Sequence, residues 1–136
     1  MSWPAALQEL VDEFVEIDDQ FEKLEVVMDF SKEVVELPFE EWNENNRVHG
    51  CQSEAHVEIS ILDEKVSMRA GADAQIVQGL MGILTIAVNG SSCKEVLDLS
   101  PGFAEEMGIL NSLTPSRSNG FRTMFDMIQN SVKEMM

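Results

Sequence analysis

Two runs of apolar residues with helical spacing open the chain. The first run consists of Leu7, Leu10, Val11, Phe14 and Val15. The second run consists of Phe21, Leu24, Val27, Met28, Val34 and Val35. Spacing of three or four residues predicts an amphipathic helix for each run. Pro4 suits a first helical turn, and helix is disfavoured just before Pro38. We therefore expect two helices over residues 4–37, with a break near Asp18 and Asp19.

The middle of the chain changes to the two-residue period of β-strands. One face of residues 56–62 carries Val57, Ile59 and Ile61, and the other carries His56, Glu58 and Ser60. Residues 63–65 can turn the chain into a second strand over 66–70, and residues 47–49 resemble a short strand before them. The pattern predicts a three-stranded antiparallel meander over residues 46–70.

Helix signals dominate the rest of the chain, from residue 73 to residue 135. Asp73 is a good N-cap for a helix to about Val88, which is apolar on nearly every side and should be buried. Gly79 and Gly82 on this helix permit close approach of another segment. Later helices can start at Ser92, Ser100 and Thr114, and the last carries an apolar stripe of Phe121, Met124, Phe125, Ile128 and Val132. A small antiparallel sheet packed against helices makes an α+β fold.

The length and composition agree with one folded domain over residues 1–136, and the charge excludes some classes of binding partner. A chain of 136 residues with 44% hydrophobic residues can bury a core without disulfides or metal. The net charge is −16, of which −15 falls on residues 1–64. Such a surface repels phosphate backbones and anionic lipids, so we expect neither nucleic acid nor membrane as a partner. The acidity fits a solvated face or a docking surface for a basic protein.

The start of the chain and its apolar stretches predict a cytoplasmic protein. The first twenty residues contain six acidic residues and no Lys or Arg, unlike a secretory leader. The most apolar stretch, residues 76–88, is shorter than the roughly 20 residues that cross a bilayer.

Cys51 is the residue best suited to chemistry. Gly50 precedes it between two strand-like segments, which favours a turn that exposes the thiol, although free cysteines are often simply buried. His49 and His56 are poorly spaced for a metal site with Cys51 and for a catalytic base, and we interpret both as partly exposed surface residues. A lone cysteine fits exchange of sulfur with a partner's persulfide, and Cys93 is interpreted as structural.

Three ordered motifs resemble the SufE-like sulfur-acceptor proteins. They are RVHGCQS (residues 47–53), GADAQIVQGL (residues 71–80) and LTPSRSNG (residues 113–120), with a weaker match in SKEVVELP (residues 31–38). The sequence departs from the family pattern C-Q-S-x-V-W at His56, which stands in the tryptophan position, and Ser31 replaces a glycine.

The resemblance implies a SufE-like fold, related to that of the iron–sulfur scaffold proteins, and an accessory protein that is not itself an enzyme. Cys51 would accept sulfur as a persulfide from a PLP-dependent cysteine desulfurase, stimulate that enzyme, and pass the sulfur to an iron–sulfur assembly scaffold. Gly50, Gln52 and Ser53 would support its loop, and no cofactor or metal would be bound.

Two further site residues and two other functions stay open on the sequence alone. Arg117 is a desulfurase contact or a solvated side chain, and Asp73 is a helix cap or a second partner contact. An iron–sulfur or zinc scaffold and a general cysteine enzyme are the alternatives. The chain is expected to be a monomer or a homodimer.

Overall fold

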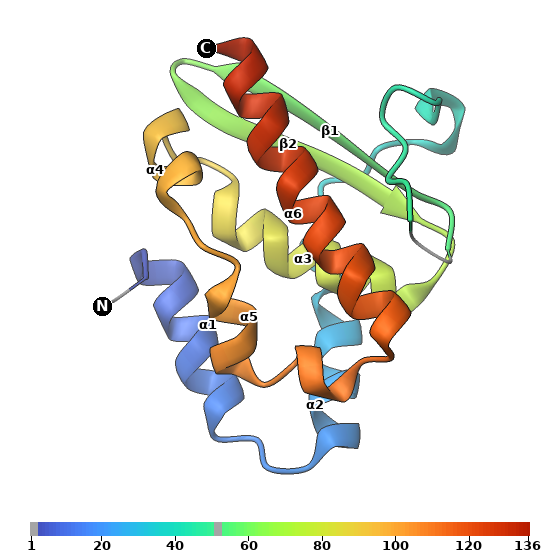
Figure 1. The fold of residues 1–136 in the computed structure, drawn as a ribbon, viewed down its shortest axis with the longest axis vertical. Coiled ribbons are helices and arrows are strands. Elements are labelled where there is room, and N and C mark those ends of the chain that lie inside the picture. Colours follow the sequence, from blue (N-terminus) through green and yellow to red (C-terminus); the bar gives the residue numbers. More distant parts are fainter. Residues whose placement is uncertain (1–2, 51–52) are drawn as a thin grey trace.

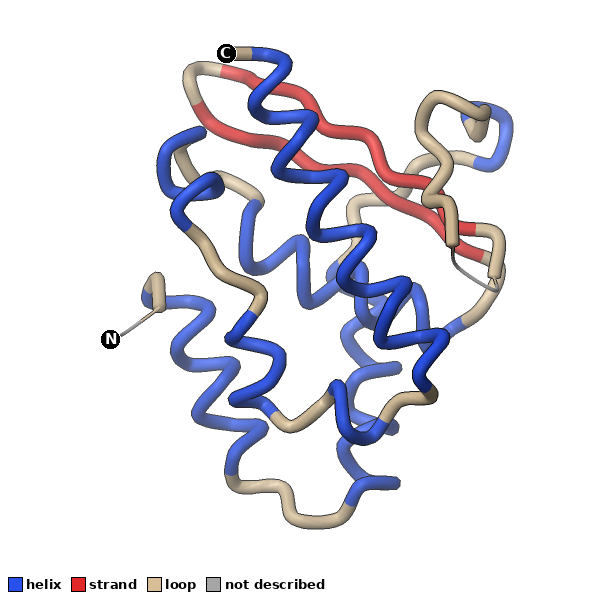
Figure 2. The backbone as a smooth tube through the Cα atoms, in the orientation of Figure 1, coloured by secondary structure: helices blue, strands red, loops and turns tan. Residues whose placement is uncertain are grey.

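A hairpin of two strands lies against a layer of helices in the computed structural model, which describes residues 3–50 and 53–136 (Figures 1 and 2). The α-helices of these residues are α1 (Ala5–Val15), α2 (Gln20–Asp29), α3 (Gln75–Val88), α4 (Cys93–Asp98), α5 (Gly102–Met107) and α6 (Pro115–Met135). The strands are β1 (Ala55–Leu62) and β2 (Lys65–Ala72), and the 3-10 helices are η1 (Phe30–Glu33), η2 (Phe39–Glu41) and η3 (Leu110–Ser112). The fold is therefore α+β, as predicted.

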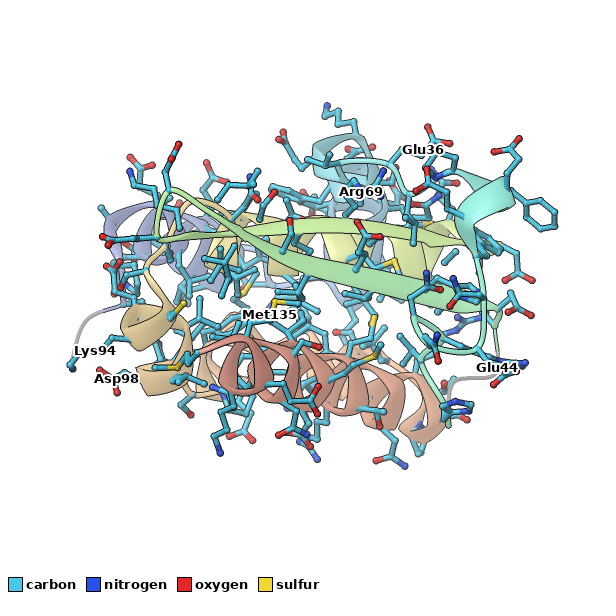
Figure 3. The ribbon with its side chains drawn as sticks, turned by 90° about the horizontal axis from the view of Figure 1, so that it is seen from above. Glu36, Glu44, Arg69, Lys94, Asp98 and Met135 are labelled. Atoms are coloured by element: carbon cyan, nitrogen blue, oxygen red, sulfur yellow. The ribbon has the colours of Figure 1, made fainter. Side chains whose placement is uncertain are left out.

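The hairpin buries one face and leaves the other away from the helices. Its buried face carries Val57, Ile59, Val66, Met68 and Ala70, with α6 packed along β1 and α3 along β2. The opposite face pairs Glu58 with Arg69, and Figure 3 shows Arg69 on the side of the strands away from α6. The tight turn between the strands places Asp63 and Glu64 at positive φ.

The predicted third strand is wrong, because residues 47–49 pair with β1 at a single bridge between Arg47 and His56. Hydrogen bonds from Val48 N to Ala55 O and from Val57 N to Asn46 O, both 2.8 Å, hold this short contact. Pairing cannot extend further, since residues 43–46 turn through side-chain hydrogen bonds before it and Gly50 bends the chain after it.

The second predicted helix ends earlier than residue 37. After η1 the chain is extended, and Glu36 forms a parallel bridge to Ala70 on β2. Leu37 N donates to Ala70 O at 2.9 Å, and Ala70 N donates to Val35 O at 3.0 Å. Residues 35–37 thus pair with the open edge of β2, although their apolar residues also suit a helix. This segment leads the chain over the outer face of the hairpin.

The centre of the molecule is α3, whose burial confirms the prediction from its composition. Both of its glycines allow a close helix contact. A Cβ at Gly79 would collide with the carbonyl of Val27, and one at Gly82 with the carbonyl of Phe30. The missing side chains therefore let α2 and η1 pack directly onto α3. No helix in the described parts of the chain is long and apolar enough to span a membrane.

The helix starts predicted at Ser92 and Thr114 are confirmed, the one at Ser100 is shifted so that Pro101 is the N-cap of α5, and the one at Asp73 is wrong. Ser92 accepts a hydrogen bond from Glu95 N while the Glu95 carboxylate accepts one from Ser92 N, which is a capping box. Thr114 accepts from Arg117 N at the start of α6. Asp73 does not cap α3, since Ala74 occupies the N-cap and the Asp73 carboxylate binds the backbone of Glu54.

Candidate functional site

The segments on either side of Cys51 are held by several contacts, although Cys51 and Gln52 lie outside the described residues. Gly50, which leads into them, has φ +85°, the left-handed region that favours glycine. On the approach side, Val48 is tied to Ala55 by a backbone hydrogen bond. On the exit side, Ser53 and Glu54 are bound to two segments that are distant in the sequence.

Arg117 lies next to this exit segment. Its Nη1 donates to Ser53 Oγ at 3.4 Å, a contact that spans 64 residues of sequence. The arginine sits in the first turn of α6, where the Thr114 hydroxyl caps the helix. The half-buried guanidinium thus faces the cysteine-bearing segment from the start of the last helix.

Asp73 is the second distant residue at this segment. Its carboxylate accepts from Glu54 N at 3.1 Å, and its own N–H donates to Glu54 O at 3.1 Å. These bonds extend the pairing of β1 and β2 by one residue beyond Ala55 and Ala72. Asp73 therefore anchors the loop stem, a role that helix-capping statistics could not reveal.

His56 is buried, which corrects its interpretation as a partly exposed surface residue. Only 3% of the residue is exposed. Its Nδ1 lies 2.6 Å from Asn46 Oδ1, and its Nε2 lies 2.6 Å from Glu54 Oε2. The Asn46 amide is oriented by two further bonds, since its oxygen accepts from Asn43 N and its nitrogen donates to Glu41 O.

These contacts fix where protons lie. Asn46 Oδ1 can only accept, so His56 Nδ1 must carry a proton. The contact between Nε2 and Glu54 Oε2 needs a second proton, because an imidazole lone pair and a carboxylate would otherwise repel each other. Arg47 Nε lies 3.8 Å from the same carboxylate oxygen. One proton therefore lies on His56 Nδ1, and a second proton is shared between His56 Nε2 and the Glu54 carboxylate.

Trp42 was missed by sequence reasoning and completes the surroundings of His56. The two rings stack at 4.7 Å with an angle of 20° between their planes. Trp42 Nε1 donates to Leu37 O at 3.0 Å, which fixes the indole. Trp42 lies 14 residues before His56, and no local pattern in the sequence connects the two.

The two remaining candidates lie apart from this cluster. His49 is exposed, and its Nε2 is 3.7 Å from Glu44 Oε2. Cys93 begins α4, and Figure 3 shows Lys94 and Asp98 of that helix at the opposite end of the molecule from Glu44. Within residues 3–50 and 53–136, no group of three His, Cys, Asp or Glu side chains is arranged to hold a metal ion.

Comparison with known sequences decides the family. The family model described as SufE, Fe-S metabolism associated domain, matches residues 8–132. The chain belongs to the SufE family. An uncharacterized SufE-like protein of Synechocystis sp. is 34% identical over 126 residues, covering 93% of this chain and 79% of that protein. An uncharacterized SufE-like protein of Rhizobium etli is 30% identical over 135 residues, covering 95% of this chain and 90% of that protein.

Two other relatives extend the comparison. SufE-like protein 1, chloroplastic/mitochondrial, of Arabidopsis thaliana is 32% identical over 127 residues, covering 93% of this chain and 34% of that longer protein. The solution structure of a hypothetical protein from Thermus thermophilus superimposes with a TM-score of 0.82 at 25% identity, covering 97% of this chain and 96% of that one. These matches confirm the fold and a connection to iron–sulfur metabolism.

Proposed function

We propose that this SufE-family chain accepts sulfane sulfur on Cys51 from a PLP-dependent cysteine desulfurase and delivers it to an iron–sulfur assembly scaffold. In the first step the Cys51 thiolate attacks the outer sulfur of the desulfurase persulfide. The sulfur–sulfur bond of the donor breaks, a new one forms on Cys51, and the desulfurase cysteine leaves as a thiolate. Redox states balance without an added oxidant or reductant.

The observation that supports this function is the meeting of three distant motifs at Ser53 and Glu54, the residues that follow the Cys51 segment. Asp73, from the second motif, holds the backbone of Glu54. Arg117, from the third motif, donates to Ser53. Residues from three separate motifs thus meet at the segment that follows Cys51, as expected if that segment carries the reactive thiol.

Each predicted site residue has a proposed role in this scheme. Gly50 allows the turn into the loop, and Gln52 and Ser53 support it on the far side of the cysteine. Arg117 and Asp73 lie beside the segment that follows Cys51, so we assign them to contact with a docked desulfurase in addition to their internal bonds. The chain acts as a carrier and activator, with PLP held by the partner. Its location in the cytoplasm remains part of the proposal.

The test is sulfur transfer measured by intact mass. Incubation with a cysteine desulfurase, PLP and cysteine should add the mass of one sulfur atom, removable by reductant, and should raise desulfurase turnover. Cys51→Ser should abolish both effects. Cys93→Ser is the matched control and should leave both largely intact. Persulfide found only on Cys93 would refute the assignment, and metal near one equivalent in protein purified without chelator would favour a scaffold instead.

A further inference from the structure

A groove of about 480 Å³ opens between the segments that lead into and out of the cysteine loop. Its lining combines three rings with three carboxylates, namely Phe39, Trp42, His56, Glu40, Glu44 and Glu54. None of these groups has a role in the sulfur-transfer step. A volume of several hundred Å³ is in the range that accommodates a ligand of side-chain size or larger.

Contacts within the chain position the aromatic lining. Phe39 lies on Trp42 with ring centroids 5.0 Å apart, and Trp42 stacks in turn on His56. The indole is fixed by its bond to Leu37 O. Phe39 nevertheless remains 74% exposed. The groove therefore offers an ordered, solvent-facing aromatic surface, which is where cations bind through the electron-rich faces of the rings.

The charges of the groove add to this preference. Arg47 is the one Lys or Arg among the described residues that line the groove, and it is engaged by Glu44 at 3.5 Å and Glu54 at 3.8 Å. Glu40 makes no ion pair within the described parts of the chain. Since His56 and Glu54 share a proton and Arg47 offsets Glu44, the groove keeps one net negative charge, at Glu40, on the half of the chain that carries a net charge of −15.

We infer that this groove binds the guanidinium group of an arginine side chain presented by a partner protein. A guanidinium is planar, so it can stack on the exposed ring of Phe39 while it donates hydrogen bonds to the Glu40 carboxylate. A lysine ammonium is compact and strongly hydrated, which makes it a poorer match for a stacked site. Naming the desulfurase as that partner rests on the proposed function, whereas the arginine preference does not.

The first experiment uses small probes and the intact chain. The probe is Nα-acetyl-arginine methylamide, and the readout is the NMR shift of the Trp42 indole N–H in ¹⁵N-labelled protein. We expect saturable binding with a Kd on the order of millimolar, because one stacked, charge-assisted contact supports no more. The citrulline amide, a neutral isostere, should bind about tenfold more weakly or worse, and the lysine amide should bind more weakly than the arginine amide.

Two matched double variants separate the groove from the general acidity of the protein. Phe39→Ala/Glu40→Gln removes an exposed ring and the adjacent carboxylate from the groove. Phe21→Ala/Glu22→Gln removes the same pair of side chains from the start of α2, where Phe21 is 79% exposed. The groove variant should lose most of the arginine response, and the α2 variant should keep it.

Several results would overturn the inference. They are equal binding of arginine and citrulline amides, equal or tighter binding of the lysine amide, the same loss in both double variants, or no Trp42 shift at about 100 mM probe, well above a millimolar Kd. Each result is independent of sulfur transfer to Cys51. Where that transfer is observed, the groove variant should also weaken desulfurase binding in calorimetry by about tenfold relative to the α2 variant.

Discussion

Replacing His56 tests the buried cluster beside the cysteine loop. His56→Ala removes a ring stacked on Trp42 and two hydrogen bonds made by a pair that shares a proton. Stacking contributes about 0.5–1.5 kcal/mol, and hydrogen bonds involving a charged group about 1.5–3 kcal/mol. Asn46 keeps its bond from Asn43 N, and Glu54 keeps Arg47 nearby, so no buried charge is stranded. Both hydrogen bonds belong to one shared charge, so the charged contribution is counted once, and the loss in free energy of unfolding should be about 2–4.5 kcal/mol.

Urea denaturation measures this loss against two controls. His49→Ala replaces the other histidine, whose side chain is 70% exposed, and should change stability by less than about 0.5 kcal/mol. Glu54→Gln keeps a hydrogen-bonding group at His56 Nε2, because an amide can present either its oxygen or its nitrogen. We expect it to cost less than about 1 kcal/mol, since its ion pair with Arg47 is long and partly exposed.

Two results would refute the proposed contribution of His56 to stability. If His56→Ala were no less stable than His49→Ala at an unchanged denaturant slope, the cluster would contribute nothing to folding. In the wild type, proton-detected NMR of the imidazole should find Nδ1 protonated, as the acceptor at Asn46 requires. A ring protonated only at Nε2 would contradict the hydrogen-bond assignment directly.

Two further predictions concern Arg117 and Glu95. Arg117→Ala should weaken desulfurase binding in calorimetry by about 10- to 150-fold, because one charge-assisted contact is lost. Added salt should reduce the difference in affinity between the wild type and the variant. Unchanged binding would place the docking surface elsewhere. The hydrogen bond from Ser92 N, and to a smaller extent the one with the Ser92 hydroxyl, lowers the pKa of Glu95 in the folded protein. The stabilisation by the Glu95 carboxylate is therefore present above the pKa of the unfolded chain, and it is lost as pH falls through the lower pKa of the folded protein. The thermal midpoint of Glu95→Gln should therefore approach that of the wild type as pH falls from about 6 to about 3, and a constant gap would contradict the capping role.

Local patterns were sufficient to predict most of the helices. The apolar stripe of α6 and the cap at Ser92 follow from spacing and residue type within a single element. The end of the second helix could not be found this way, because Val34 and Val35 suit a helix and an extended chain equally well. What decides between them is the backbone of Ala70, which binds Val35 and Leu37. A tertiary hydrogen bond overrides local preference there.

The prediction for His56 gave the correct face of the strand and the wrong exposure. The two-residue alternation of β1 correctly placed it with Glu58 on the face away from Val57 and Ile59. That face is open along most of the hairpin, so exposure was the natural expectation. Burial comes from the segment after residue 36, which crosses this end of the sheet and lays Trp42 over the imidazole. No pattern within β1 carries that information.

The anchors of the cysteine-bearing segment differ in strength, and the difference indicates which one a partner can replace. The Val48–Ala55 backbone bond is 2.8 Å long, and Glu54 is held to Asp73 by two bonds of 3.1 Å. The Arg117–Ser53 contact is the longest at 3.4 Å and joins a cation to a neutral hydroxyl. A carboxylate would bind that guanidinium more strongly than the hydroxyl does. The proposed docking of an acidic partner group on Arg117 would therefore release Ser53 at little cost while the backbone anchors of both stems stay in place.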